Sequence, residues 1–234
     1  MNLKELFARI VVDRIIKDAD IIAKNTILPK YIPTESPKFC VAYRAGAAGE
    51  FFSFLLLAHD SPLWKQRPLC CWLPEYNTLW KSVRNNIAAH KTHSAVNFYI
   101  RDESIPIIHL VCDIPYLTRL RPNKARLLRG VDALKDYNIR KGHIDYFLED
   151  YEDHTNVYDV EINYFNPTDN YYDLCKVLKM KPDFNFYCYA WLGYLVFTKV
   201  FIKNNRDMAM LDNAIKKLKS QLPKGYNGWT YKNF

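Results

Sequence analysis

The segment FCVAYRAGAAGEFFSFLLLA, residues 39–58, constrains the fold of this chain more than any other. Two apolar runs flank a short stretch of small residues. The chain has only 7 glycines in 234 residues, and two of them, Gly46 and Gly49, stand between the runs. We predict a buried strand over 39–43 and a largely buried helix over 49–59, joined by a tight turn.

Two interpretations of this turn stay open. Backbone N–H groups that converge at a helix N-terminus bind phosphate, because the helix dipole adds about half a positive charge there. Gly46 would then adopt a positive φ, and Gly49 would let a ligand approach closely. Alternatively, the turn is a compact strand–helix connection in which alanines only save space. The Walker A pattern is not met, because Glu50 stands at its lysine position.

Composition indicates a folded protein with anionic partners. The chain is 49% hydrophobic and 15% aromatic, which is enough for a substantial core, and its net charge is +8. Such a charge favours nucleotides, nucleic acid or anionic lipid headgroups. The 6 cysteines show no CxxC spacing, and most stand in apolar stretches, which is typical of buried, reduced thiols. Because acidic residues interrupt the apolar start of the chain, we expect no signal peptide, and the reduced thiols indicate a cytoplasmic location.

Strands alternate with helices along the chain, which predicts an α/β domain with three layers and a mainly parallel sheet. Further strands are expected over 68–73, 94–100, 105–112 and 157–164, with 105–112 central. Helices are expected over 74–90, 115–150 with a break near Pro122, 166–180, 184–203 and 205–222. The uncharged run within 184–203 is shorter than the ~20 residues of a membrane-spanning helix, so we predict a buried core helix and no membrane span.

Three parts are expected along the chain: an N-terminal amphipathic helix over 1–27, the α/β domain over 38–204, and a C-terminal helix with a tail over 205–234. The C-terminal helix carries an apolar stripe that permits helix pairing or docking on a protein partner. The stripe consists of Met208, Leu211, Ile215, Leu218 and Leu222.

Three motifs resemble those of sulfotransferases. Arg44-Ala45-Gly46-Ala47-Ala48 resembles the K/R-x-G-T-T turn that holds the 5′-phosphosulfate of the donor. Leu57-Ala58-His59 resembles the family's L-x-H-P after the next helix, and VEINYFNPTDNYYDLCKVLKM (160–180) is similar to a later strand, N-P and helix. Their order and spacing agree over about half of the chain, 38–60 and 105–180. The chain therefore resembles divergent sulfotransferase-like P-loop proteins of phages and other viruses.

The resemblance implies a P-loop-like fold and transfer of a sulfuryl group from 3′-phosphoadenylyl sulfate to a hydroxyl acceptor, with no metal. The donor would bind the turn residues Arg44, Ala45, Gly46, Ala47, Ala48 and Gly49. Glu50 or His59 would accept the proton of the acceptor hydroxyl. These two lie about 13 Å apart along one helix, so both cannot serve one site. Glu50 also fits an acid favoured by the helix dipole, and His59 a simple helix-end residue.

The chain departs from the family at two places. The turn has alanines where the family has Thr or Ser hydroxyls, and Cys112 stands where the family has an arginine for the donor's 3′-phosphate. Arg119 and Arg121, in the basic segment 117–129, are the candidates to replace that arginine. The same segment also fits a solvated helix face, or a surface that docks on nucleic acid or an acidic protein.

A second function therefore stays open, that of a catalytically inactive structural or interaction module in a viral particle or large assembly. Such a module would dock on partners through its terminal helices and on nucleic acid through the basic segment. His90 and His93 lack a third ligand at zinc-like spacing, so no metal site is predicted.

Overall fold

The computed structural model describes residues 39–44, 46–59, 89–92, 105–129 and 158–224. Their strands form a four-stranded sheet in the order β2-β1-β3-β4, in which every neighbouring pair is parallel. The strands are β1 (Phe39–Tyr43), β2 (Ala89–Thr92), β3 (Ile107–Val111) and β4 (Val160–Asn163). The chain thus has the α/β character and the parallel sheet that its sequence predicts, with β3 inside the sheet as expected.

The inner strands are buried because both of their faces are covered. All five residues of β1 are buried, and alternate residues point to opposite sides of the sheet. Phe39, Val41 and Tyr43 belong to the main core, whereas Cys40 and Ala42 pack with Ile107 on the other face. A continuous apolar run, rather than an alternating one, is what a parallel strand in the interior requires.

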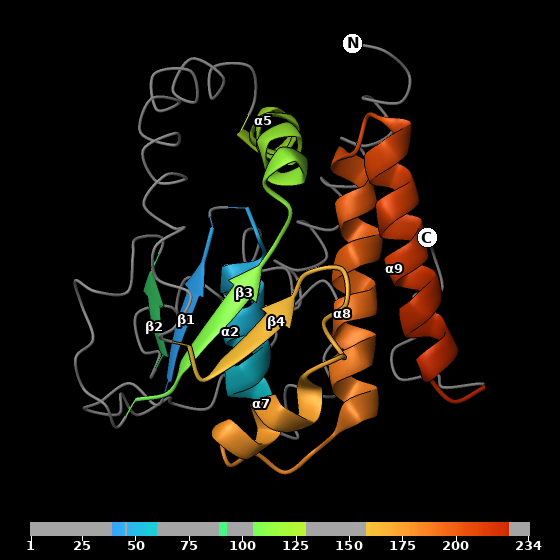
Figure 1. Cartoon of the computed structure of the whole chain (residues 1–234). Coiled ribbons are helices and arrows are strands. Elements are labelled where there is room, and N and C mark those ends of the chain that lie inside the picture. Colours follow the sequence, from blue (N-terminus) through green and yellow to red (C-terminus); the bar gives the residue numbers. More distant parts are fainter. Residues whose placement is uncertain (1–38, 45, 60–88, 93–104, 130–157, 225–234) are drawn as a thin grey trace, which may run out of the picture.

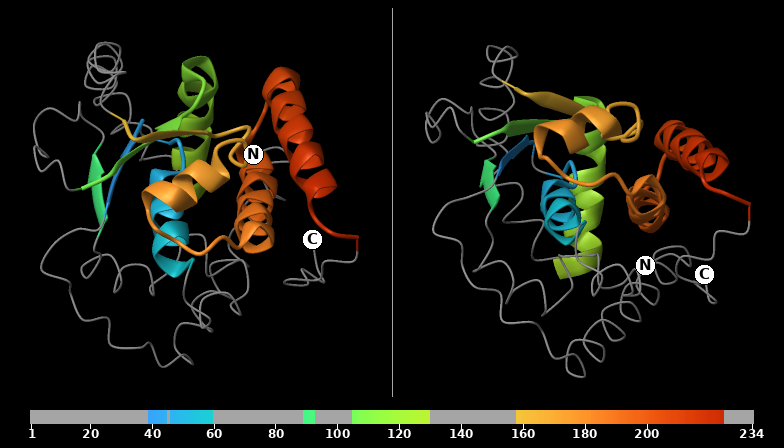
Figure 2. Two further views of the ribbon diagram at one scale, coloured as in Figure 1. Left: turned by 60° about the horizontal axis from the view of Figure 1, so that its bottom comes forward. Right: turned by 90° about the horizontal axis from the view of Figure 1, so that it is seen from below.

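Helix α2 (Gly49–Ala58) lies between the sheet and α8 (Phe184–Thr198) (Figures 1 and 2). Its Phe51 ring stacks on Tyr194 of α8, with centroids 4.3 Å apart, and meets Trp191 edge-on at 5.2 Å. Contacts on several sides explain why nearly every described side chain of α2 is apolar.

Helix α8 is the aromatic core helix expected over 184–203, extended by a short 3-10 helix, η5 (Lys199–Phe201). Its first turn is capped by Asp183, whose carboxylate accepts from the Phe186 amide at 3.2 Å. Among the described residues, no helix combines the length and the apolar character needed to span a membrane.

Helix α9 (Asn205–Gln221) packs along the side of α8 that faces away from α2 (Figures 1 and 2). Leu211, Ile215 and Leu218 of its apolar stripe are buried in the main core. These three residues are therefore covered within the chain, and docking of a partner on the rest of the stripe stays a prediction.

Helix α5 (Ile114–Arg129) lies beyond the carboxyl ends of the strands, and α7 (Tyr171–Val177) lies at the opposite end of the sheet (Figure 1). Contrary to the expected break, α5 continues through Pro122. A proline inside a helix costs about 3 kcal/mol. Burial of Tyr116, Leu117 and Leu120 in the core holds α5 together despite this cost.

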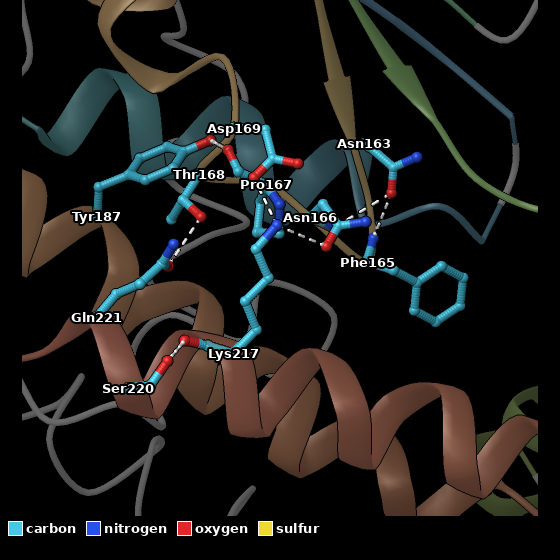
Figure 3. A network of polar contacts seen from close by, with 10 residues as sticks. All are labelled: Asn163, Phe165, Asn166, Pro167, Thr168, Asp169, Tyr187, Lys217, Ser220 and Gln221. Carbon is cyan, nitrogen blue, oxygen red and sulfur yellow. Dashed lines mark hydrogen bonds and ion pairs between the residues drawn. The ribbon is translucent and has the colours of Figure 1, made fainter.

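The loop between β4 and α7 is tied to α9 and α8 by the polar contacts of Figure 3. The Lys217 ammonium donates to Asn166 Oδ1 at 3.0 Å and to Asp169 Oδ1 at 2.7 Å. Tyr187 donates to the Pro167 carbonyl at 3.0 Å. These contacts hold residues 166–169 in a loop, so the helix expected from residue 166 begins only at Tyr171.

One further boundary differs from expectation. Ala89 and His90 belong to β2, whereas the sequence predicts them at the end of a helix over 74–90. Pairing with β1, in which Cys40 lies opposite His90, outweighs the local helical preference. The segments 1–27, 68–73, 94–100, 130–150 and 225–234 lie outside the described residues.

We predict that Gly49→Ala lowers the free energy of unfolding by about 3 kcal/mol, because overpacking a closed core is costly. A Cβ at this position would lie 2.1 Å from the Tyr43 ring. Urea denaturation measures the loss. Ala48→Gly, which adds no atom to the same turn, is the matched control and should change stability by no more than about 1 kcal/mol. Equal stability of Gly49→Ala and the unmodified chain would contradict this close packing.

Candidate anion-binding site

The turn between β1 and α2 has the backbone geometry of an anion-binding concavity. Gly46 has φ 95° and Ala48, the N-cap of α2, has φ 66°, so both adopt left-handed conformations. Gly49 follows in the right-handed helix. A left-handed residue followed by a right-handed one turns successive N–H groups toward a common point, which is a backbone nest.

Most of the described amides of this turn donate to no described acceptor. The Ala47 amide donates to the Arg44 carbonyl at 2.9 Å and closes the turn. The amides of Gly46, Ala48 and Gly49 have no acceptor among the described residues. No side chain caps the helix at Ala48. The N-terminus of α2 therefore has backbone donors without an acceptor in the described part of the chain, which is the feature of helix N-termini that bind anions.

The two glycines of the turn serve different purposes. At Gly49 a Cβ would lie within 2.2 Å of three ring atoms of Tyr43, so this glycine is required by strand–helix packing. At Gly46 the positive φ favours glycine, and a Cβ would lie 2.9 Å from Cγ of Arg121. The compact-connection interpretation thus explains Gly49, and the anion-binding interpretation rests on Gly46 and its neighbours.

The turn lies at the carboxyl end of β1, where the strand order reverses. From β1 the chain continues to β2 on one side, and β3 then pairs on the other side. In open parallel sheets, ligands bind in the crevice outside the carboxyl ends of the strands at such a switch point.

Two arginines lie at this edge. The aliphatic part of Arg121 from α5 lies against Gly46. Arg44 follows β1 directly, and its charge acts on the neighbouring strand. Burial, with the Arg44 charge, lowers the pKa of His109 to about 4. The neutral His109 ring stacks on Tyr158, with centroids 4.1 Å apart.

Arg119 is directed away from the turn. Its Nε and Nη2 donate to the two carboxylate oxygens of Asp207 on α9, at 2.9 Å and 2.6 Å. The hydrogen bond from Arg119 lowers the pKa of Asp207, which is 1% exposed. The pair joins α5 to α9, so of the two expected phosphate ligands the structure brings Arg121 to the turn and Arg119 to Asp207.

His59 lies at the other end of α2, fully buried. Its Nε2 forms a hydrogen bond of 2.9 Å with the hydroxyl of Tyr171, which also accepts from the Asp183 amide at 2.5 Å. This arrangement joins three helices and gives His59 a structural role. Glu50 stands in the first turn of α2, but its side chain and all of Ala45 lie outside the described part of the chain.

Cys112 and Asp113 follow β3 at the same edge. Cys112 is buried, and burial raises the pKa of its thiol well above the usual range, so the thiol is neutral. A neutral thiol does not replace the arginine that the family has here. Asp113 caps α5, because its Oδ1 accepts from the Tyr116 amide at 2.7 Å.

The sequence reasoning missed Asp207 and Tyr171, the partners that orient Arg119 and His59. Asn204 and Asp207 carry a local signal, since an Asn N-cap with an acid three residues later is typical of a helix start. No local pattern connects Asp207 to a residue 88 positions earlier. In the described part of the chain, no three His, Cys, Asp or Glu side chains are grouped to hold a metal ion. His93 lies outside that part.

Comparison with known proteins gives no match: the chain matches no protein-family model, no curated protein and no solved structure.

We predict that Asp207→Asn lowers the free energy of unfolding by about 1–3 kcal/mol near neutral pH, because Arg119 loses a charged acceptor. Since the folded pKa of Asp207 is lowered, the pair stabilises fully above the unfolded pKa of about 3.9 and is lost as the pH falls through the folded value. The difference between the two proteins should therefore shrink between about pH 6 and about pH 2 in urea denaturation.

Asp212→Asn is the matched control on the same helix. Asp212 pairs with Lys199 at 2.6 Å, but both side chains are at least 36% exposed. Such a pair contributes at most about 1 kcal/mol. Equal losses for the two variants at neutral pH would contradict the special role of the Arg119 contact.

Proposed function

We propose that the chain binds the phosphosulfate end of 3′-phosphoadenylyl sulfate at the Arg44–Gly49 turn. We propose further that it acts as a sulfotransferase-like protein, and that its fold is P-loop-like with three layers. The observation that carries this proposal is the nest formed at Ala48 and Gly49 beside Arg121. It supports binding of a tetrahedral anion through backbone amides, which is also what the resemblance of the turn implies.

The proposed reaction needs charge stabilisation more than side-chain chemistry. The acceptor oxygen forms a bond to sulfur while the bond from sulfur to the 5′-phosphate oxygen breaks, and adenosine 3′,5′-bisphosphate leaves. The amides of Gly46, Ala48 and Gly49 would stabilise the charge that develops on the leaving phosphate.

Glu50 is the proposed acceptor of the hydroxyl proton, because it stands in the first turn of the helix that begins at the nest. His59 is not retained in this role, since it is buried at the far end of α2 and bonded to Tyr171. For the 3′-phosphate, Arg121 is retained and Arg119 is not, because Asp207 already takes both of its donors.

A second candidate function is that of a catalytically inactive module of a viral particle or large assembly. Two observations favour it. Cys112 is neutral where the family has an arginine, and Ala47 and Ala48 offer no hydroxyls to a phosphosulfate. Such a module would keep the fold but would not bind 3′-phosphoadenylyl sulfate.

Calorimetric titration with adenosine 3′,5′-bisphosphate tests the donor site. We expect micromolar binding that Arg121→Ala weakens by about 10-fold or more, because a charge-assisted contact is lost. Gly46→Val should abolish binding for two reasons. A side chain at this position collides with Arg121, and valine does not tolerate the positive φ of Gly46. Lys216→Ala, at an exposed position of α9, removes the same charge and should leave binding unchanged. No binding by the unmodified chain would favour the module.

Conversion of the donor tests the transfer step separately. With a mixture of hydroxyl acceptors, we expect release of adenosine 3′,5′-bisphosphate, measured by chromatography. Glu50→Gln should retain affinity for the bisphosphate and lose turnover by about 100-fold or more, as expected when a general base is removed. Turnover that survives Glu50→Gln would exclude Glu50 as the base, and binding without any turnover would indicate a non-catalytic nucleotide-binding protein.

A further inference from the structure

Helix α8 carries no charged side chain on any of its faces. All 15 residues of Phe184–Thr198 are apolar, aromatic or uncharged. A helix of this composition is stable when it is covered on every side. Seen end-on in the right view of Figure 2, α8 has α2 on one side and α9 on another, and none of the described helices or strands lies against the remaining side. The stability of α8 requires that this side is covered as well.

An apolar stripe runs along this remaining side of α8. Trp191 and Tyr194 project from α8 toward Phe51 of α2. Because a helix turns by about 100° per residue, Val196 lies on the opposite side from these two rings. Val196 is 39% exposed, one of the two exposed large hydrophobic side chains in the described part of the chain. The outer stripe of α8, continued by η5, consists of Tyr189, Leu192, Val196 and Val200.

The N-terminal segment of the sequence carries a stripe of matching length. Its apolar residues recur at the spacing of one helix face, with charged residues between them. In a helix, residues 3–15 span about 18 Å and residues 189–200 about 16 Å. Two such stripes can pack side by side along their whole length. The stripe of the segment consists of Leu3, Leu6, Phe7, Ile10, Val11 and Ile15.

The connection between this segment and the sheet is long enough for such packing. Residues 28–38 lead to Phe39, the first residue of β1, and include three prolines that favour an extended chain. When extended they reach about 36 Å. Packed layers lie about 10 Å apart, so the three steps from β1 through α2 and α8 to a docked helix amount to about 30 Å.

We propose that residues 3–15 form a helix that docks on the outer stripe of α8 in the same chain. The short connection gives the segment an effective concentration on the order of millimolar. A second copy at micromolar concentration therefore does not compete with it. The docked helix covers the apolar stripes of both partners, so the segment does not serve to bind other proteins. This inference is independent of the proposed donor site.

A photocrosslinker at the centre of the outer stripe tests the contact in the full chain. With benzoylphenylalanine in place of Val196, we expect irradiation to join position 196 to a peptide within residues 1–27 of the same chain, identified by mass spectrometry. The same group in place of Asn213, exposed on α9, is the matched control and should not react with that segment. A crosslink to residues 130–157 or 225–234, a covalent dimer, or no crosslink at all would overturn the proposal.

A pair of substitutions tests the same contact by its energetics. Val196→Asp and Ile10→Asp each place a carboxylate between the two stripes, so each should lower the midpoint of urea unfolding. The double variant should lose less than the sum of the two losses, because either substitution alone opens the contact. Arg9→Asp places the same side chain on another face of the segment and should leave the midpoint nearly unchanged. Strictly additive losses, or no loss in Ile10→Asp, would contradict the docking.

Discussion

The contact between the Tyr43 ring and Gly49 is the constraint on which the candidate site depends. It brings the first residue of α2 against the last residue of β1, where no side chain larger than hydrogen fits. With both ends held, the chain between them must reverse direction over a few residues. Gly46 and Ala48 do so in left-handed conformations, and the alternation of left- and right-handed residues makes successive amides converge. The candidate anion site is thus a consequence of close strand–helix packing.

The rest of the architecture is held by apolar contacts in its interior and by polar contacts at the ends of its helices. Aromatic rings of α2 and α8 form the centre, where Phe51, Trp191 and Tyr194 meet. Charged contacts join α5 to α9 and the β4–α7 loop to α9. This division is expected, because burial of apolar area supplies most of the stability while an unpaired buried charge is costly.

For the candidate site, local patterns predicted the backbone and not the partners of the side chains. The tight turn between strand and helix agrees with the structure, since a strand, a run of small residues and a helix constrain one another over short distances. Arg119 and Arg121 are two residues apart in sequence and look equivalent there. They project from different sides of α5, because a helix turns by about 100° per residue, and so they meet different neighbours.

The sequence by itself determined the α/β class, the strand 39–43, the helices 49–58 and 184–198, and the turn between strand and helix. Each of these depends on the period of apolar residues or on glycine, and both act within a few residues. Tertiary structure alone decided that α5 passes through Pro122, that most of the α9 stripe is buried in the core, and that His59 bonds to Tyr171. These outcomes depend on contacts between segments far apart in the chain, whose energies no local pattern contains.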